Sequence, residues 1–225
     1  MEKPIELNQI IPEDLINLIG DHIKAGVSDA ESKFALNEED EDSITGALGQ
    51  AISTAHPIVL TTAQGKFTYE ITSRKLRGRG PDAPEKRLGA DAIFQIEVFR
   101  QGQRVFRKGL PFQAKNGGGF QNSEVIKQAG DLHRTTGTGI IVRFSKDGYT
   151  AINASEIVFS DQANAVATPQ IIPTKLGSVL GNDFLNCRVG KIGLTYDSEA
   201  VSGDSKGIWV ISTKVASEGN TASSD

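Results

Sequence analysis

Two strand-like runs, ADAIFQIEVF at 90–99 and VFRKGLPFQAK at 105–115, are separated only by a short polar turn. Apolar, β-branched and aromatic runs joined by so few turn residues favour an antiparallel β-hairpin. If the hairpin is centred on Gly102, three apolar pairs fall on one face, as cross-strand packing requires. These pairs are Ala92 with Phe112, Phe94 with Leu110, and Val98 with Phe106. A shift of one residue would split the apolar partners between two faces, so the pattern predicts this register.

The opposite face of the hairpin carries polar residues. In the same register Asp91 lies opposite Gln113, and Lys115 follows one step further along that face. Facing side chains of paired strands lie within about 5 Å of one another. Glu97 opposite Arg107 adds an opposite-charge pair. The polar end of the hairpin is therefore a candidate functional site.

Two residues interrupt the hairpin pattern. Ile96 meets Lys108, and Pro111 has no N–H to donate to a central rung. We therefore expect a β-bulge near 109–111, which would shift Gln113 by one position.

The other segments alternate between helical and strand patterns. Helical spacing of apolar residues predicts helices over 12–23, 122–134 and 174–187. In the second of these, Val125, Ala129 and Leu132 share one side, and in the third Leu176, Val179, Leu180 and Phe184 recur at helical spacing. Strands are expected over 66–76, 139–144, 149–153, 190–196 and 207–213. This order of elements predicts an α/β domain with a mixed β-sheet.

The same order divides the chain into four regions. Residues 1–36 form an N-terminal helical segment, and residues 37–155 form the core domain. Residues 156–215 are expected to be a C-terminal α/β extension that either completes the fold or makes an interface. Residues 216–225 have the composition of a disordered tail.

An acidic run at 38–42 precedes the first strand. We expect a helix with Asn37 as its N-cap and the acidic residues in its first turn, where the helix dipole favours negative charge. Its buried stripe is defined by Ile44, Leu48, Ile52 and Ala55. Glu41 falls inside that stripe, and a cation shared with Asp91 would compensate its burial. The alternative is that Glu41 lies at a frayed helix start and reaches water.

Composition excludes several classes of protein. With 38% hydrophobic and 23% charged residues among 225, the chain resembles an ordinary globular protein. No apolar run reaches the roughly 18 residues that span a bilayer, and the N-terminus lacks a secretory pattern, so we expect a cytoplasmic protein without a membrane partner. A single cysteine, Cys187, and three histidines exclude a disulfide framework and a Cys/His zinc site.

Charge is unevenly distributed along the chain. The net charge of -4 argues against a protein that coats nucleic acid indiscriminately, but it allows one local basic surface. Such a surface is expected in the loop 77–89, whose basic residues include Arg77, Arg79, Lys86 and Arg87.

Asp91 and the Gln113–Ala114–Lys115 run resemble the Asp…(Glu/Gln)-x-Lys core of the PD-(D/E)xK nuclease superfamily. The Gln variant is similar to Mrr-type restriction endonucleases, whose third motif is Gln-x-Lys. Glu41, the basic loop and the helix–strand unit after Lys115 follow in the order of that core. The resemblance covers roughly residues 38–153 and implies a restriction-endonuclease-like mixed sheet flanked by helices.

The resemblance implies a Mg²⁺- or Mn²⁺-dependent endonuclease. The metal ligands would be the Asp91 carboxylate, the Gln113 side-chain carbonyl and the Ala114 backbone carbonyl, with Glu41 binding directly or through a water. Lys115 would orient the attacking water and stabilise transition-state charge. Gln128 resembles a helix Gln found after the Lys in several branches and is a candidate accessory residue, with a surface amide as the alternative.

One departure from the family pattern concerns the literal Pro-Asp at Pro81–Asp82. It lies in the basic loop, and the hairpin register gives Asp82 no partner near Lys115, so we assign the Asp role to Asp91. The expected partner is nucleic acid, in the form of double-stranded DNA, with backbone phosphates held by the four basic loop residues. The architecture suits a bacterial or phage-defence effector controlled by a protein partner or by homo-oligomerisation. The alternative is a catalytically inactive module of the same fold that binds a partner or nucleic acid.

Overall fold

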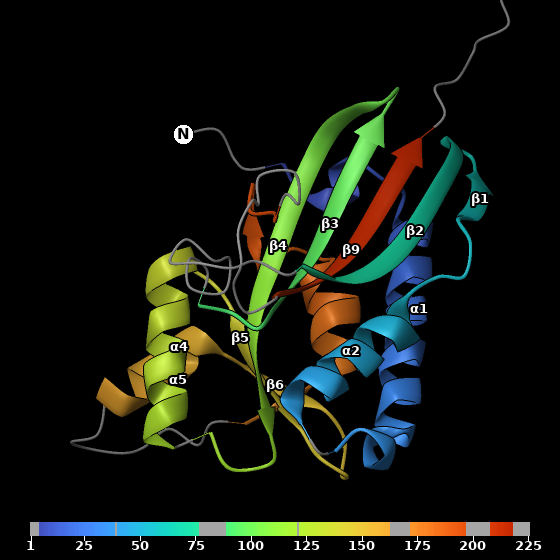
Figure 1. The fold of residues 1–225 in the computed structure, drawn as a ribbon. Coiled ribbons are helices and arrows are strands. Elements are labelled where there is room, and N and C mark those ends of the chain that lie inside the picture. Colours follow the sequence, from blue (N-terminus) through green and yellow to red (C-terminus); the bar gives the residue numbers. More distant parts are fainter. Residues whose placement is uncertain are drawn as a thin grey trace, which may run out of the picture.

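The computed structural model describes residues 5–38, 40–76, 89–120, 122–162, 172–196 and 208–217. A β-sheet lies between two groups of helices (Figure 1). Helices α1 (Glu13–Ser32) and α2 (Glu41–Ile52) lie on one face, and α4 (Ser123–Thr136) and α5 (Ala154–Gln162) lie on the other. The predicted α/β class is confirmed.

The sheet has the strand order β1-β2-β9-β3-β4-β5-β6-β7, and β8 pairs with β4 beside this path. Strand β3 is parallel to β9 and β4 is parallel to β5, whereas the remaining pairs are antiparallel, so the sheet is mixed as expected. The strands are β1 Ile58–Thr62, β2 Gly65–Leu76, β3 Ala92–Arg100, β4 Gln103–Asn116, β5 Ile140–Phe144, β6 Thr150–Asn153, β7 Thr174–Lys175, β8 Lys191–Ile192 and β9 Ile208–Ser217. The strand expected over 190–196 is thus only two residues long.

A shorter helical segment packs against α1. Helix α6 (Leu176–Ser178) continues into a π-helical stretch, Val179–Phe184, and both lie against α1. The four apolar residues predicted to face the core here are all buried. Short 3-10 turns, Leu7–Gln9 and Phe34–Leu36, flank α1. No helix in the described part of the chain is long and apolar enough to cross a membrane.

Each face of the sheet has its own apolar layer. Under α1 and α2, residues such as Ile23 and Leu48 pack with Phe112 of β4. Under α4 and α5, Leu132 packs with Ile141 of β5. The α4 positions predicted to share one side, Val125, Ala129 and Leu132, all belong to this second layer. The alternation of residues along β4 between the two layers decides which helix each site residue meets.

The predicted hairpin register is confirmed. Ala92 pairs with Phe112, Phe94 with Leu110, and Val98 with Phe106. The expected bulge near Pro111 is wrong, because the register changes instead between Val98 and Phe99, next to the turn.

The backbone directions explain why Pro111 needs no bulge. Phe112 accepts a hydrogen bond from the Asp91 N–H through its carbonyl, and Ala114 donates its N–H to the Asp91 carboxylate, so both direct their backbone polar groups toward β3. Because successive residues of a strand alternate in direction, the ring nitrogen of Pro111 faces away from β3. The β3–β4 ladder therefore loses no donor at this proline.

Helix α2 begins later than the expected Asn37. The Asn37 N–H closes the 3-10 turn by donating to the Phe34 carbonyl, and Asp40 is the N-cap. The Asp40 carboxylate accepts from the backbone N–H groups of Asp42 and Ser43 at 2.8 and 2.9 Å. Hydrogen bonds from Ser43, first from its side chain and then from its backbone, lower the pKa of Asp40 below the usual value.

The predicted buried stripe of α2 is confirmed for three of its four positions. Ile44, Leu48 and Ile52 are fully buried, whereas Ala55 lies beyond the end of the helix and is exposed.

The C-terminal strand β9 occupies the middle of the sheet. It pairs antiparallel with β2 and parallel with β3, so the segment furthest along the chain joins the two (Figure 1). Strand β9 includes Ala216 and Ser217, which were expected in the terminal tail; the rest of that tail, 218–225, lies outside the described residues.

Candidate active site

Gln113 and Lys115 lie near the carboxyl end of β4 and face α4. They alternate with Phe112 and Ala114, which are buried in the layer under α1 and α2. Gln113 is 8% exposed and Lys115 is also largely covered, with 20% of its side chain exposed. Both polar side chains are therefore held in place by the protein.

Asp91 lies immediately before β3 and is bound to β4 on both sides of Gln113. Its N–H donates to the Phe112 carbonyl at 3.0 Å, and its carboxylate Oδ2 accepts from the Ala114 N–H at 2.8 Å. The Trp209 N–H of β9 donates to the Asp91 carbonyl at 3.0 Å. The regular ladder ends at Ala92, and Asp91 reaches the β4 backbone around Gln113 instead of forming the next regular pair.

The Gln113 carboxamide has a defined orientation. Its Nε2 donates to the Gly89 carbonyl at 2.7 Å. Since the two ends of a carboxamide point in different directions, the side-chain oxygen is turned away from Gly89. Gly89 adopts a positive φ of 60°, which glycine reaches without strain. Its carbonyl lies beside the Gln113 side chain on β4.

Lys115 lies between two carboxylates from helices on opposite faces of the sheet. Its Nζ is 3.7 Å from Glu41 Oε2 of α2 and 3.9 Å from Glu124 Oε1 of α4. Figure 1 shows α2 and α4 on either side of β4. Two helices remote in sequence therefore converge on one cation.

Glu41 is the first residue of α2 and also binds the end of β4. Its Oε1 accepts the Asn116 N–H at 3.0 Å, while Asn116 Nδ2 donates to the Glu38 carbonyl at 2.5 Å. These contacts place Glu41 beside Lys115, while 39% of its side chain remains exposed at the start of the helix. The N-cap bonds of Asp40 hold the helix start that carries it.

Gln128 is linked to Lys115 indirectly, through Glu124. Its Nε2 donates to Glu124 Oε1 at 3.3 Å, and Glu124 in turn lies beside Lys115. The Gln128 Oε1 is buried with no hydrogen-bond partner among the described residues. Within the described residues, the accessory position suggested by the resemblance connects to the lysine through Glu124.

Sequence reasoning missed Glu124 and Asn116. Glu124 carries a local signal, because it lies four residues before Gln128 and such residues are neighbours on a helix surface. Asn116 follows Lys115 directly, but only the packing of α2 against the end of β4 reveals its contact with Glu41. The basic loop residues Arg77, Arg79, Lys86 and Arg87, together with Asp82, lie outside the described residues.

The donor atoms around Asp91 suit a hard cation. Mg²⁺ prefers oxygen ligands, and the candidate set contains the Asp91 carboxylate and the Gln113 and Ala114 carbonyls. Because Ala114 directs its N–H toward Asp91, its carbonyl points to the same side of β4. Within the described residues no group of three or more His, Cys, Asp or Glu is placed to hold a metal ion. The set therefore relies on carbonyl oxygens, and Glu41 is already paired with Lys115 and Asn116.

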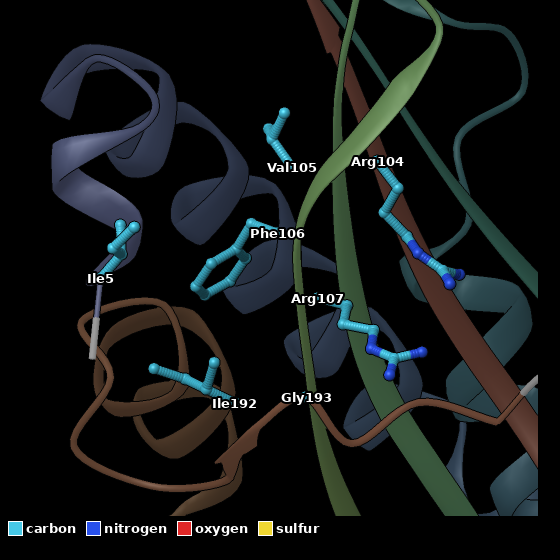
Figure 2. A pocket seen from close by; sticks show the side chains of 7 residues that line it. All are labelled: Ile5, Arg104, Val105, Phe106, Arg107, Ile192 and Gly193. Carbon is cyan, nitrogen blue, oxygen red and sulfur yellow. The ribbon is translucent and has the colours of Figure 1, made fainter. Parts of the chain in front are cut away.

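A separate pocket of about 470 Å³ lies near the turn end of β4 (Figure 2). Phe106 points toward Ile5 and Ile192, whereas Arg104 and Arg107 extend on the other side of the strand. Arg107 and Lys115 are eight residues apart on β4, or roughly 25 Å along an extended strand. The pocket is therefore distinct from the candidate active site.

No family model, curated protein or solved structure matches this chain.

Proposed function

We propose that the protein is a metal-dependent nuclease that hydrolyses phosphodiester bonds in DNA. One observation carries the proposal: Gln113 and Lys115 stand side by side on β4, with Asp91 bound to the same stretch of backbone and Glu41 beside the lysine. A carboxylate, a carboxamide and a covered lysine in this arrangement suit hydrolysis at an anionic phosphate. The restriction-endonuclease-like character of the fold is part of this proposal.

The proposal assigns a role to each residue of the site. The Asp91 carboxylate and the Gln113 and Ala114 carbonyls would hold Mg²⁺ or Mn²⁺, with Glu41 binding directly or through a water. When bound, such an ion neutralises phosphate charge and lowers the pKa of a coordinated water. Lys115 would orient the attacking water and would stabilise negative charge on the phosphate as the bond breaks.

The proposed substrate is duplex DNA in the cytoplasm. Arg77, Arg79, Lys86 and Arg87 would contact backbone phosphates, which position a duplex without reading its sequence. A protein partner or self-association would control the activity in a bacterial or phage-defence setting.

An inactive binding module is the second candidate, and the bonding of the site favours it in one respect. The Asp91 Oδ2 already accepts the Ala114 N–H, Glu41 is already paired, and the position of a third carboxylate is taken by Gln113. A fold that had lost catalysis would keep such bonds for stability. In that case Lys115 would be dispensable for binding.

The test is cleavage of supercoiled plasmid DNA by the purified full chain with Mg²⁺ or Mn²⁺. Asp91→Asn and Lys115→Ala are compared with wild type, and an EDTA sample removes the metal. Lys127→Ala is the matched control, because Lys127 is an exposed lysine on the same helix as Glu124. The proposal expects metal-dependent nicking that both site variants abolish and the control retains.

Two results would contradict the proposal in different ways. Cleavage that survives in both site variants would show that Asp91 and Lys115 are not the active site. No cleavage, together with no binding of Mn²⁺ to wild type in a titration that monitors Mn²⁺ paramagnetic resonance, would favour the inactive module. Mn²⁺ binding that is present in wild type and lost in Asp91→Asn would instead support the metal site.

A further inference from the structure

Arg143 of β5 lies directly beside Lys115. Strands β4 and β5 are parallel, and Lys115 and Arg143 are register partners. Side chains of register partners on neighbouring strands project from the same face, with backbones about 4.8 Å apart. Arg143 also shares its face with Ile141, which belongs to the layer under α4. Two cations therefore stand next to each other on the face of the sheet that carries the candidate active site.

Arg143 has no acidic partner within ion-pair distance in the part of the chain that the structure describes. Lys115, by contrast, has two carboxylates nearby. The Arg143 Nε is buried and has no hydrogen-bond partner there, and Nη1 makes a long bond of 3.4 Å to the Gly118 carbonyl. Its guanidinium lies 5.4 Å from the centre of the Phe120 ring. A partly covered guanidinium with an unpaired N–H is costly unless a ligand or a water completes its hydrogen bonds, and its positive charge favours an anion.

The turn that joins β4 to α4 leaves room for such an anion. Gly117 and Gly118 have positive φ angles of 68° and 70°, and a Cβ at either position would meet no atom within 4 Å. Glycines are thus required here by backbone conformation and not by packing. The space next to the turn allows a ligand to approach the backbone between Lys115 and Arg143.

We propose that Arg143, Lys115 and the Gly117–Gly119 turn bind a phosphate of a nucleic-acid backbone. The identity of the ligand rests on the proposed function. The phosphate bound here would be adjacent, along the DNA backbone, to the phosphate that is hydrolysed. A guanidinium presents paired N–H donors that match two phosphate oxygens, and among the described residues the terminal nitrogens of Arg143 make only the long bond from Nη1 to Gly118. Glu124 acts as the counter-ion of Lys115 in the free protein, and its side chain is 68% exposed, so it is free to swing into water when phosphate binds.

The test is binding of a short fluorescein-labelled DNA duplex to the full chain in EDTA, measured by anisotropy over a range of salt concentrations. Arg143→Gln removes the charge, and Arg143→Lys keeps the charge without the paired donors. Arg107→Gln is the matched control, since it makes the same change in net charge at an exposed position on the far part of β4. Thermal melts of each variant exclude loss of folding.

We expect Arg143→Gln to weaken binding about tenfold and to reduce the slope of log affinity against log salt by about one, because one phosphate contact is lost. Arg143→Lys should fall between wild type and Arg143→Gln, and Arg107→Gln should bind within about twofold of wild type. Glu124→Gln should bind a few-fold more tightly, because it removes the carboxylate that competes with phosphate.

The outcomes separate this inference from the nuclease proposal. Weaker binding by Arg143→Gln without any cleavage by wild type would support the phosphate site and remove the catalytic role. Cleavage by wild type with unchanged binding by Arg143→Gln would overturn the phosphate site alone. Wild type that fails to bind the duplex at any salt concentration would overturn it as well.

Discussion

At the scale of single residues, Asp91 serves the fold as well as the proposed chemistry. Its carboxylate closes the end of the β3–β4 pairing by accepting the N–H of Ala114, a residue that is fully buried. A buried N–H left without an acceptor costs about 1–3 kcal/mol. Loss of activity in a variant at this position therefore needs a structural control.

Asp91→Asn and Asp91→Ala provide that control as a pair. We expect Asp91→Ala to lower the free energy of unfolding by about 1–3 kcal/mol, because the Ala114 N–H loses its acceptor, and Asp91→Asn to lower it by less, because its side-chain oxygen still accepts. Both should abolish nuclease activity. Urea unfolding and plasmid cleavage are measured on the same preparations. Equal destabilisation by the two variants would contradict the role of this hydrogen bond.

Lys108 is a second residue whose position has a measurable consequence. It is 1% exposed within the layer under α1 and α2, where its Nζ donates to the Phe184 carbonyl and lies 4.5 Å from the Phe184 ring centre. Burial lowers the pKa of Lys108 from 10.5 to about 8, and the neighbouring Cys187 opposes the shift. The charged form is therefore less stable in the folded protein than in water.

The resulting pH dependence has a definite sign. Between pH 8 and pH 10.5 the unfolded chain keeps the Lys108 proton while the folded chain loses it, so the free energy of unfolding rises with pH in this window. Lys108→Met lacks this titration. We expect the free energy of unfolding of wild type to rise by roughly 3 kcal/mol relative to that of Lys108→Met across the window. Urea unfolding of both proteins at several pH values measures it, and parallel pH profiles would contradict it.

At the scale of elements, the start of α2 positions Glu41. Asp40 is exposed and holds the first turn through bonds to the Asp42 and Ser43 N–H groups. Asp42 in turn accepts the indole N–H of Trp209 on β9 at 2.8 Å and pairs with Lys75 of β2. The acidic residues at this helix start therefore tie α2 to two neighbouring strands as well as to β4.

Asp40→Ala should loosen this helix start. We expect a loss of about 1 kcal/mol in the free energy of unfolding, as is typical when an N-cap is replaced by Ala. Cleavage should also fall, because Glu41 loses its fixed position beside Lys115. Asp40→Ser retains a capping oxygen and should restore most of both properties. Thermal unfolding and cleavage assays test this, and a Ser variant as weak as the Ala variant would argue against capping as the cause.

At the scale of the whole molecule, β9 joins the two halves of the sheet. Its residues pair with ten positions of β2 and nine of β3. Val210 and Ile211 are fully buried and contribute to opposite layers. Without β9, the hairpin that carries Asp91 and Lys115 would have an open edge, and both layers would lose apolar cover.

A truncation tests this dependence. A chain that ends at residue 207 should fail to fold cooperatively, because the central edges of β2 and β3 lose their partner. A chain that ends at Ser217 retains every β9 pair and should unfold at the temperature of the full chain. Circular dichroism melts of the two truncated proteins give the comparison. Cooperative unfolding of the shorter chain would show that the rest of the sheet is stable alone.

The sequence predicted those features that depend on neighbouring segments. The β3–β4 register follows from the two-residue period of strands and a short turn, so residues within 25 positions of each other contain the information. The apolar side of α4 follows from the helical period in the same way. The start of α2 was predicted three residues too early, since Asn37 and Asp40 are both good caps and the 3-10 turn at Phe34–Leu36 occupies the first.

The sequence alone determined the α/β class, the register of the hairpin and the placement of Gln113 and Lys115 on one face. Only the tertiary structure decided that β9 lies between β2 and β3, that Lys115 contacts Glu41 and Glu124 from opposite sides of the sheet, and that Arg143 stands beside it. The physical reason is the range of the interactions. Periodicity and turns act between residues close in the chain, whereas strand order and helix packing depend on which distant apolar surfaces bury one another best.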